Sequence, residues 1–224
     1  ISGYSHRNIF EKVSNNKLVV VPNCAPNDMF ISESELNKKY NKLSKLNILY
    51  LSHMTREKGS FDLLDACNKK EIKNNSCFII NFAGRFSSNL EENDFRSKIS
   101  KISNINYHGQ VSNLKKKELF KQAHIFCLPT KLLEGQPISI LEAYASGCFV
   151  LVTDKPGIRD IFKENINGFL INDSSGISIK NQIIKVQTNI PLLKKIAFKN
   201  WRLAIEDFTE DKYCEKIRRI LIKS

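Results

Sequence analysis

The chain contains no long apolar run and no leader-like beginning. None of its apolar runs approaches the roughly 20 residues that a membrane-spanning helix needs. Residues 1–10 lack the basic and then apolar pattern of a signal peptide. We therefore expect a soluble protein of the cytoplasm.

Patterns of metal ligands are also missing. The six cysteines stand singly, without a C-x-x-C pair, and the four histidines show no paired spacing on one helix face. Structural metal sites need such pairs, whereas single cysteines within apolar runs are typical of reduced thiols in a cytoplasmic protein. We expect no metal site. We also expect reduced core thiols at Cys24, Cys67, Cys77, Cys127, Cys148 and Cys214.

Positive charge is abundant, with a formal net charge of +12. Such a charge fits nucleic acid, an anionic membrane surface or an anionic substrate. Lysines gather at residues 38–45 and 115–121, but no aromatic residues interleave with them as a base-stacking surface would need. We expect no nucleic-acid partner and interpret these lysines as solvated helix faces, with peripheral contact to an anionic membrane as the open alternative.

From residue 47 onward, short apolar runs alternate with amphipathic segments. This alternation predicts a Rossmann-like α/β fold with a parallel sheet of about six strands and helices on both faces. The expected strands are residues 48–51, 77–83, 105–108, 125–128, 149–152 and 169–171, and the helices between them are residues 60–70, 93–102, 115–123, 138–146 and 157–163.

The two ends of the chain differ from this core. Residues 1–13 look like a helix, residues 18–21 look like a strand that Pro22 stops, and residues 23–32 have turn residues without a period. We interpret residues 1–32 as the end of an upstream domain and a linker, and residues 33–190 as the main domain. Residues 191–224 are expected to form helices that pack back toward the upstream domain, within helical patterns at 177–186, 191–207 and 210–222.

The stretch from residue 134 to residue 147 carries the clearest chemistry. It reads as a small-residue loop after a strand, followed by a helix whose first N–H groups face the ligand-binding edge of the sheet. Glu134 precedes this helix and Glu142 lies about two turns along it, so a diphosphate could lie between two carboxylates that accept hydrogen bonds from sugar hydroxyls. The alternative is that both glutamates are ordinary helix residues. Small neighbours such as Ala143 and Gly147 place Glu142 beside a buried segment, where it needs a partner.

This stretch, E-G-Q-P-I-S-I-L-E-A-Y-A-S-G, resembles the donor-site signature of the retaining glycosyltransferases of family four, which have the GT-B fold. Neighbouring segments agree in the same order along nearly the whole chain. They are V-P-N with Phe30, residues 48–59 as the first strand and its K-G turn, Y-H-G-Q-V at 107–111, residues 120–130, G-I-R-D at 157–160 and N-G-F-L at 167–170.

The resemblance implies roles for individual residues. Glu142 would bind the ribose hydroxyls, Glu134 would contact the transferred sugar and stabilise charge at its anomeric carbon, and Lys58 would neutralise the diphosphate leaving group. Backbone N–H groups of the loop would hold sugar or diphosphate oxygens, although Pro137 has none to donate. The loop residues concerned are Gly135, Gln136, Pro137, Ile138 and Ser139.

The chain departs from the family at the first strand-end turn and in the linker. His53 stands where the family has an arginine, Ser52 stands where it has a glycine, and Cys24 replaces a linker glycine. Because imidazole is often uncharged at neutral pH, we expect weaker neutralisation of the diphosphate or compensation by Arg56 or Arg85.

Further donor contacts are expected at strand ends: Gly59, Gly84 with Arg85, and Gly109 with Val111 near the base. Each has a plainer alternative. Lys58 before Gly59 also suits an exposed helix start, and His53 and Arg85 also suit solvated loops, whereas Leu114 is expected in the core.

The expected function is transfer of a sugar from a nucleoside-diphosphate sugar, with a UDP-sugar favoured, to a polysaccharide or lipid-linked acceptor with retention of configuration. The resemblance implies no essential metal and no cofactor beyond the nucleotide-sugar substrate. It also implies a bacterial enzyme of surface polysaccharide synthesis, with the acceptor bound by the missing domain. The alternatives are a nucleotide-sugar 2-epimerase and a non-catalytic basic module that binds nucleotides or nucleic acid.

Overall fold

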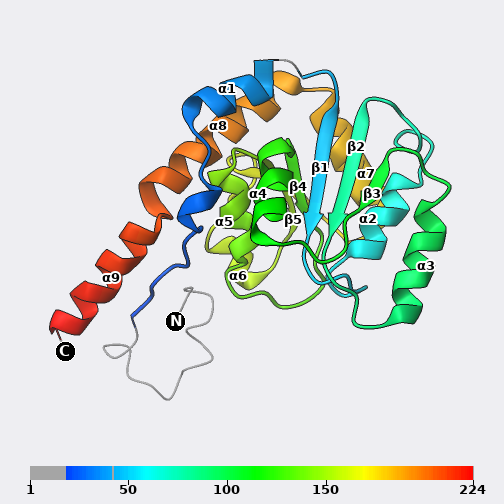
Figure 1. Ribbon diagram of the computed structural model, residues 1–224. Helices are drawn as coiled ribbons and strands as arrows, with labels where there is room; N and C mark the ends of the chain where they lie inside the picture. Colours follow the sequence, from blue (N-terminus) through cyan, green and yellow to red (C-terminus); the bar gives the residue numbers. More distant parts are fainter. Residues whose placement is uncertain (1–18, 42, 224) are drawn as a thin grey trace.

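The centre of the molecule is one parallel sheet. The computed structural model describes residues 19–41 and 43–223, and its six strands run in the order β3-β2-β1-β4-β5-β6 (Figure 1). Every pair of neighbouring strands is parallel, so the predicted sheet is confirmed. The strands are β1 (Leu46–Leu51), β2 (Phe78–Ala83), β3 (Ile105–Tyr107), β4 (Ile125–Leu128), β5 (Phe149–Thr153) and β6 (Gly168–Ile171).

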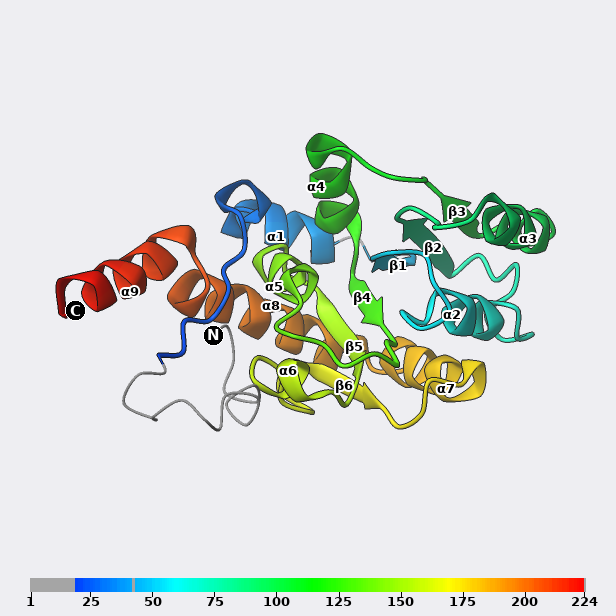
Figure 2. The same cartoon turned by 90° about the horizontal axis from the view of Figure 1, so that it is seen from below.

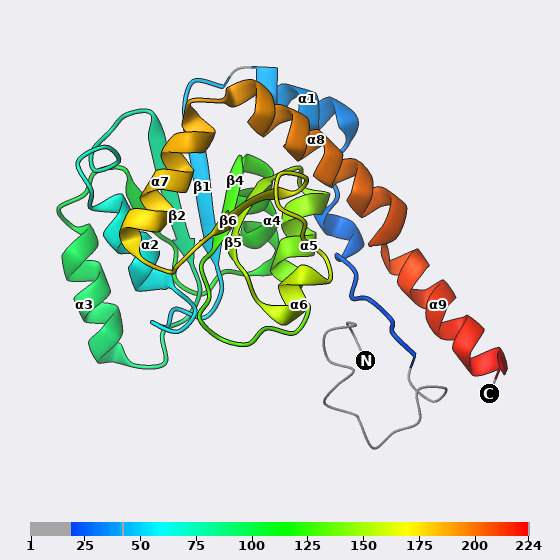
Figure 3. The same cartoon turned by 180° about the vertical axis from the view of Figure 1, so that it is seen from behind.

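Helices cover both faces of the sheet, as expected. Figures 1 and 2 show α4 and α5 on one face, and Figure 3 shows α2 and α7 side by side on the other. The central strands β4 and β5 are buried along their whole length, which explains their unbroken apolar sequences. The helices of this part are α2 (Ser60–Cys67), α3 (Asn89–Ile99), α4 (Asn113–Gln122), α5 (Ile138–Ala145) and the short α6 (Pro156–Arg159).

The segment before the sheet differs from the expectation. Residues 1–18 lie outside the described part of the chain, and residues 19–21 belong to no strand, so the part of the expected 18–21 strand that the structure describes is wrong. The chain then forms a short 3₁₀ helix, η3 (Asn27–Met29), and the unexpected helix α1 (Glu33–Asn41). Ser32 and Glu35 form a capping box at its start, with Ser32 N donating to Glu35 Oε2 over 2.8 Å.

The C-terminal helices follow the predicted pattern. They are α7 (Gly176–Gln187), α8 (Ile190–Asp207) and α9 (Glu210–Lys223). α8 packs on α5 and β5, and its Trp201 donates from Nε1 to the carbonyl oxygen of Ile31 over 2.8 Å. α9 extends away from the sheet (Figure 1). None of the helices in the described part of the chain is long and apolar enough to cross a bilayer.

Two expectations about single residues are wrong. All six cysteines are free, but only Cys67, Cys127 and Cys148 are buried, while Cys77 and Cys214 are exposed. Leu114 was expected in the core and is 83% exposed, because it lies in the first turn of α4 on the side away from the sheet.

Candidate functional site

The loops that follow β1, β2 and β3 meet the start of α5 around a cavity of about 520 Å³. β1 and β4 are neighbours at the point where the strand order reverses, which is where open α/β sheets bind ligands. The cavity is lined by Leu51, Ser52, His53, Gly84, Arg85, Gln110, Val111, Lys116 and Ser139. It therefore brings together five expected site residues from four separate segments: His53, Gly84, Arg85, Val111 and Ser139.

Close backbone approaches shape these loops, and two glycines permit them. A Cβ atom on Gly84 would lie 1.8 Å from the carbonyl oxygen of Ser52, and one on Gly59 would lie 2.3 Å from that of Pro129. Both have positive φ angles, +145° and +83°. The N–H of Gly84 also donates to the carbonyl oxygen of Gly109 over 2.8 Å. Only glycine fits these positions, so the loops after neighbouring strands are held against one another.

Glu134 lies in a compact hydrogen-bonded group. Its side chain is 9% exposed, and Lys58 Nζ lies 2.6 Å from Oε1 and 2.9 Å from Oε2. The hydroxyl of Thr130 also donates to Oε1 over 2.7 Å. Glu134 is therefore not a solvated helix residue, and Lys58 is a partly buried partner of it and not an exposed lysine at a helix start. Thr130 is a member of the group that the sequence did not single out.

Glu142 lies on α5 and has a different partner. Its side chain is 5% exposed, and Lys116 Nζ from α4 lies 2.7 Å from Oε1. The expectation that a carboxylate at this position needs a partner is confirmed. The partner is the unexpected part, because Lys116 belongs to a cluster interpreted as a solvated helix face. Lys116 is 24% exposed and lines the cavity, so that interpretation is wrong for this lysine.

The loop between Glu134 and α5 is tied to the linker. Asn23 N donates to Gln136 Oε1 over 2.7 Å, and Asn23 Nδ2 donates to the carbonyl oxygen of Gln136 over 2.9 Å. α5 begins at Ile138 after Pro137 without a side-chain cap. The first N–H groups of such a helix have no partner within the helix, which makes its start an anion site.

The basic side chains near the cavity differ in whether they can reach a ligand bound in it. Arg85 and His53 are exposed and line it. Arg56 instead stacks over the ring of Phe61 at 4.1 Å and pairs with Asp94 of α3 at 3.5 Å. Of the two arginines proposed to compensate for His53, only Arg85 is therefore placed to reach a ligand in the cavity. Among residues 19–41 and 43–223, no three histidine, cysteine, aspartate or glutamate side chains are grouped so that they could hold a metal ion.

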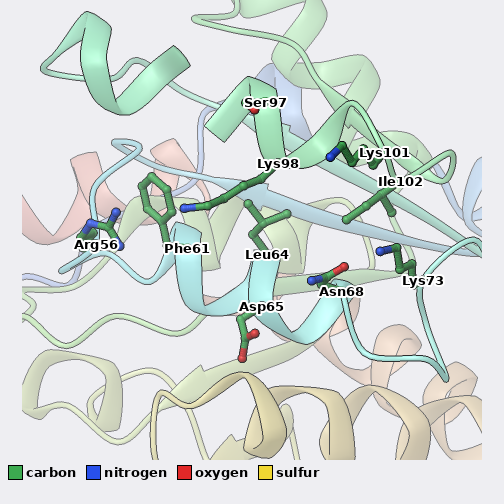
Figure 4. Close-up of a pocket in the computed structure, with 10 residues that line it drawn as sticks. All are labelled: Arg56, Phe61, Leu64, Asp65, Asn68, Lys73, Ser97, Lys98, Lys101 and Ile102. Carbon is green, nitrogen blue, oxygen red and sulfur yellow. The ribbon is translucent and has the colours of Figure 1, made fainter. Parts of the chain in front are cut away.

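Another cavity, of about 490 Å³, lies between α2 and α3 (Figure 4). It is lined by Arg56, Phe61, Leu64, Asp65, Asn68, Lys73, Ser97, Lys98, Lys101 and Ile102. Its lining includes no residue of the loops after β2 and β3, none of the start of α5 and not Lys116, the partner of Glu142. The candidate site is therefore the cavity at the strand ends.

Comparison with known proteins gives the same assignment. The family model of glycosyl transferases group 1 matches residues 32–200. A galactosyltransferase of Escherichia coli, described as UDP-Gal:alpha-D-GlcNAc-diphosphoundecaprenol alpha-1,3-galactosyltransferase, is 26% identical over 219 residues, 92% of this chain and 54% of that protein. The chain thus spans about half the length of this relative.

Two solved structures show the same fold. HepE of Anabaena in complex with UDP superposes with a TM-score of 0.81 at 16% identity, covering 98% of this chain and 61% of that one. The C-terminal domain of a group 1 glycosyl transferase from Francisella tularensis gives 0.67 at 17% identity, covering 81% of this chain and 96% of that domain. The expected fold, the C-terminal half of a GT-B protein, is confirmed. With its strand-end site and a family match over most of its length, this chain belongs to the glycosyl transferases group 1 family.

Proposed function

We propose that this chain is the donor-binding half of a retaining glycosyltransferase that takes a sugar from a nucleoside-diphosphate sugar. The observation that carries the proposal is the pair of buried carboxylates, Glu134 and Glu142, each paired with its own lysine. Glu134 precedes the start of α5 and Glu142 follows it along the helix, and Ser139 of that helix start lines the strand-end cavity together with Lys116. A diphosphate at the start of α5 would have Glu134 on its sugar side and Glu142 on its nucleoside side.

In the proposed reaction, Lys58 supplies positive charge to the diphosphate as the bond to the sugar breaks. Its ammonium already lies 2.6 Å from Glu134, so one group can balance the carboxylate and the leaving group together. The N–H groups of Ile138 and Ser139 at the start of α5 offer hydrogen-bond donors to the diphosphate, and the exposed Arg85 adds positive charge. Glu134 in turn stabilises positive charge at the anomeric carbon. This arrangement favours a front-face mechanism without an essential metal.

A UDP-sugar is the favoured donor. The Escherichia coli relative is described by a UDP-galactose donor, and HepE was solved with UDP. We propose a polysaccharide or lipid-linked acceptor that binds to a domain outside these 224 residues, in an enzyme acting at the cytoplasmic face of a bacterial membrane. The net charge of +12 supports contact with an anionic lipid surface, and we expect no nucleic-acid partner. Residues 191–224 are proposed to pack back toward that second domain, through α9 and the face of α8 that does not contact α5 and β5.

Calorimetry with UDP, GDP and ADP tests the proposal on this chain. We expect selective binding of one diphosphate, with UDP favoured, and a loss of at least about tenfold in affinity for Glu142→Ala and Lys58→Ala, because each removes a charged hydrogen bond. Glu33→Ala, on the exposed face of α1, is the matched control. If duplex DNA bound more tightly than every nucleotide, in a salt-dependent way, the basic-module alternative would replace the proposal. In the longer enzyme, product analysis separates sugar transfer from 2-epimerisation.

A further inference from the structure

Lys116 is the charged group of the site that the proposed roles leave unexplained. It projects from α4, twenty-six positions before its partner Glu142 in the sequence, and its Nζ lies 2.7 Å from Glu142 Oε1. The same side chain lines the cavity beside Val111 and Ser139. Lys116 therefore has one side against the carboxylate and the other toward the space where a donor would lie.

The two carboxylates of the site differ in how many of their oxygens accept hydrogen bonds from the protein. Both oxygens of Glu134 accept from Lys58, and Oε1 also accepts from Thr130. Glu142 has Lys116 on Oε1 alone. Its Oε2 accepts no hydrogen bond from the described part of the chain, and this oxygen is not fully buried. Lys116 thus occupies one oxygen and leaves the other for a hydroxyl of the ligand.

The helix geometry places Lys116 near the nucleoside. Glu142 is four residues beyond Ile138, which corresponds to about 6 Å along the helix axis. A diphosphate at the start of α5 would therefore bring the ribose to Glu142 and the base beyond it, toward Val111 and Gln110. The ammonium of Lys116 lies at this boundary between ribose and base.

We propose, resting on the proposed function, that Lys116 is a nucleotide-recognition residue that favours a base with carbonyl oxygens at its edge. An ammonium has three donors and no acceptor, so it can donate to the carbonyl oxygens of uracil, whereas the amino group of adenine offers it no acceptor and leaves only the ring nitrogens. It also keeps Glu142 oriented toward the ribose. Lys116 is therefore both a positioning residue for Glu142 and a specificity residue for the base.

The test measures the dissociation constants of UDP and ADP by calorimetry for the whole chain and for Lys116→Met. Methionine keeps the length of the side chain and removes the ammonium. We expect UDP to bind roughly tenfold more weakly and ADP to change much less, so the preference for UDP over ADP shrinks by a similar factor. Lys115→Met is the matched control, because Lys115 is the neighbouring lysine and pairs with Glu118 outside the cavity. It should leave both constants unchanged.

Two further variants separate recognition from folding. Lys116→Arg keeps the charge and should retain most of the UDP preference. Lys116→Met with Glu142→Gln leaves no unpaired buried charge and is expected to fold, so a preference for UDP that is smaller in this double variant than in Glu142→Gln alone also supports the proposal. An unchanged ratio of UDP to ADP affinity in Lys116→Met, or an equal loss for both nucleotides, overturns it while the donor site stands. Absence of UDP and ADP binding to the unaltered chain overturns this inference, and if GDP does not bind either, the proposed function falls with it.

Discussion

The ammonium of Lys39 in α1 donates a hydrogen bond of 2.7 Å to the carbonyl oxygen of Ser146, the C-cap residue of α5. It also lies 3.3 Å from the carbonyl oxygen of Gly147. The last carbonyl groups of a helix have no partners within it, and a lysine there satisfies them and complements the helix dipole. One end of α5 is thus capped by α1, while the other end is open to the cavity.

Replacing Lys39 with methionine should therefore destabilise the protein. The buried carbonyl oxygens would lose their donor, and we expect a loss of about 1–3 kcal/mol in the free energy of unfolding. Urea denaturation followed by circular dichroism measures it. Lys38→Met, at the exposed neighbouring position, should change the free energy by less than about 0.5 kcal/mol. Equal effects of the two substitutions would show that the capping contact contributes no stability.

Gly157→Ala should disturb the loop that carries Glu134. An added Cβ would lie 1.6 Å from the carbonyl oxygen of Gly135 and 2.4 Å from that of Glu134, so the loop must move. We expect a stability loss of about 1–3 kcal/mol and weaker UDP binding. Gly135→Ala is the control on the same contact, because a Cβ at Gly135 meets no described atom within 4 Å. Its melting temperature should match that of the unaltered chain, and a Gly157→Ala protein that behaves identically would contradict the prediction.

His124 should make the stability depend on pH. Burial, together with the charge of Lys39, lowers the pKa of its imidazole to about 4, and its Nδ1 accepts from the N–H of Asn47 over 3.0 Å. Between about pH 4 and 6.5 the unfolded chain binds a proton at this histidine and the folded chain does not. Stability is therefore complete above pH 6.5 and falls as the pH drops toward 4, by about 3 kcal/mol for this group.

Denaturation at a series of pH values measures this dependence. In His124→Asn the amide oxygen can replace Nδ1 as acceptor, and no proton is taken up, so the curve should be flatter between pH 4 and 6.5. His53→Asn is the control, because His53 is exposed beside the cavity. Parallel curves for the unaltered chain and His124→Asn would assign the acid sensitivity to other groups.

Chelation should leave nucleotide binding unchanged. In the proposed site the diphosphate charge is balanced by Lys58, Arg85 and the start of α5, which need no metal ion. We expect the same UDP dissociation constant in EDTA as in excess Mg²⁺. Binding that requires Mg²⁺ would mean that these groups do not supply enough charge by themselves.

The local pattern of apolar and polar residues was sufficient to predict most of the strands and helices. The six strands lie on the apolar runs because a strand buried on both faces has an unbroken apolar sequence. α1 was missed although its S-x-x-E signal, from Ser32 to Glu35, is in the sequence. Among its many lysines and asparagines, α1 buries only two apolar residues, Leu36 and Tyr40, which is too few to give a clear helical period.

The sequence by itself determined which residues are the candidates for the chemistry: Glu134 and Glu142 at helical spacing after a strand, and the glycines that allow close backbone approach. The tertiary structure alone decided their partners. Lys58 meets Glu134 across seventy-six positions and Lys116 meets Glu142 across twenty-six, because the crossovers of the sheet bring the loops after separate strands and α4 to the same end of the sheet. Likewise, Lys116 and Leu114 belong to the same helix, yet one reaches a buried carboxylate and the other is exposed. Helix orientation against the sheet sets that difference, and a weakly amphipathic, lysine-rich segment does not encode it in its own pattern.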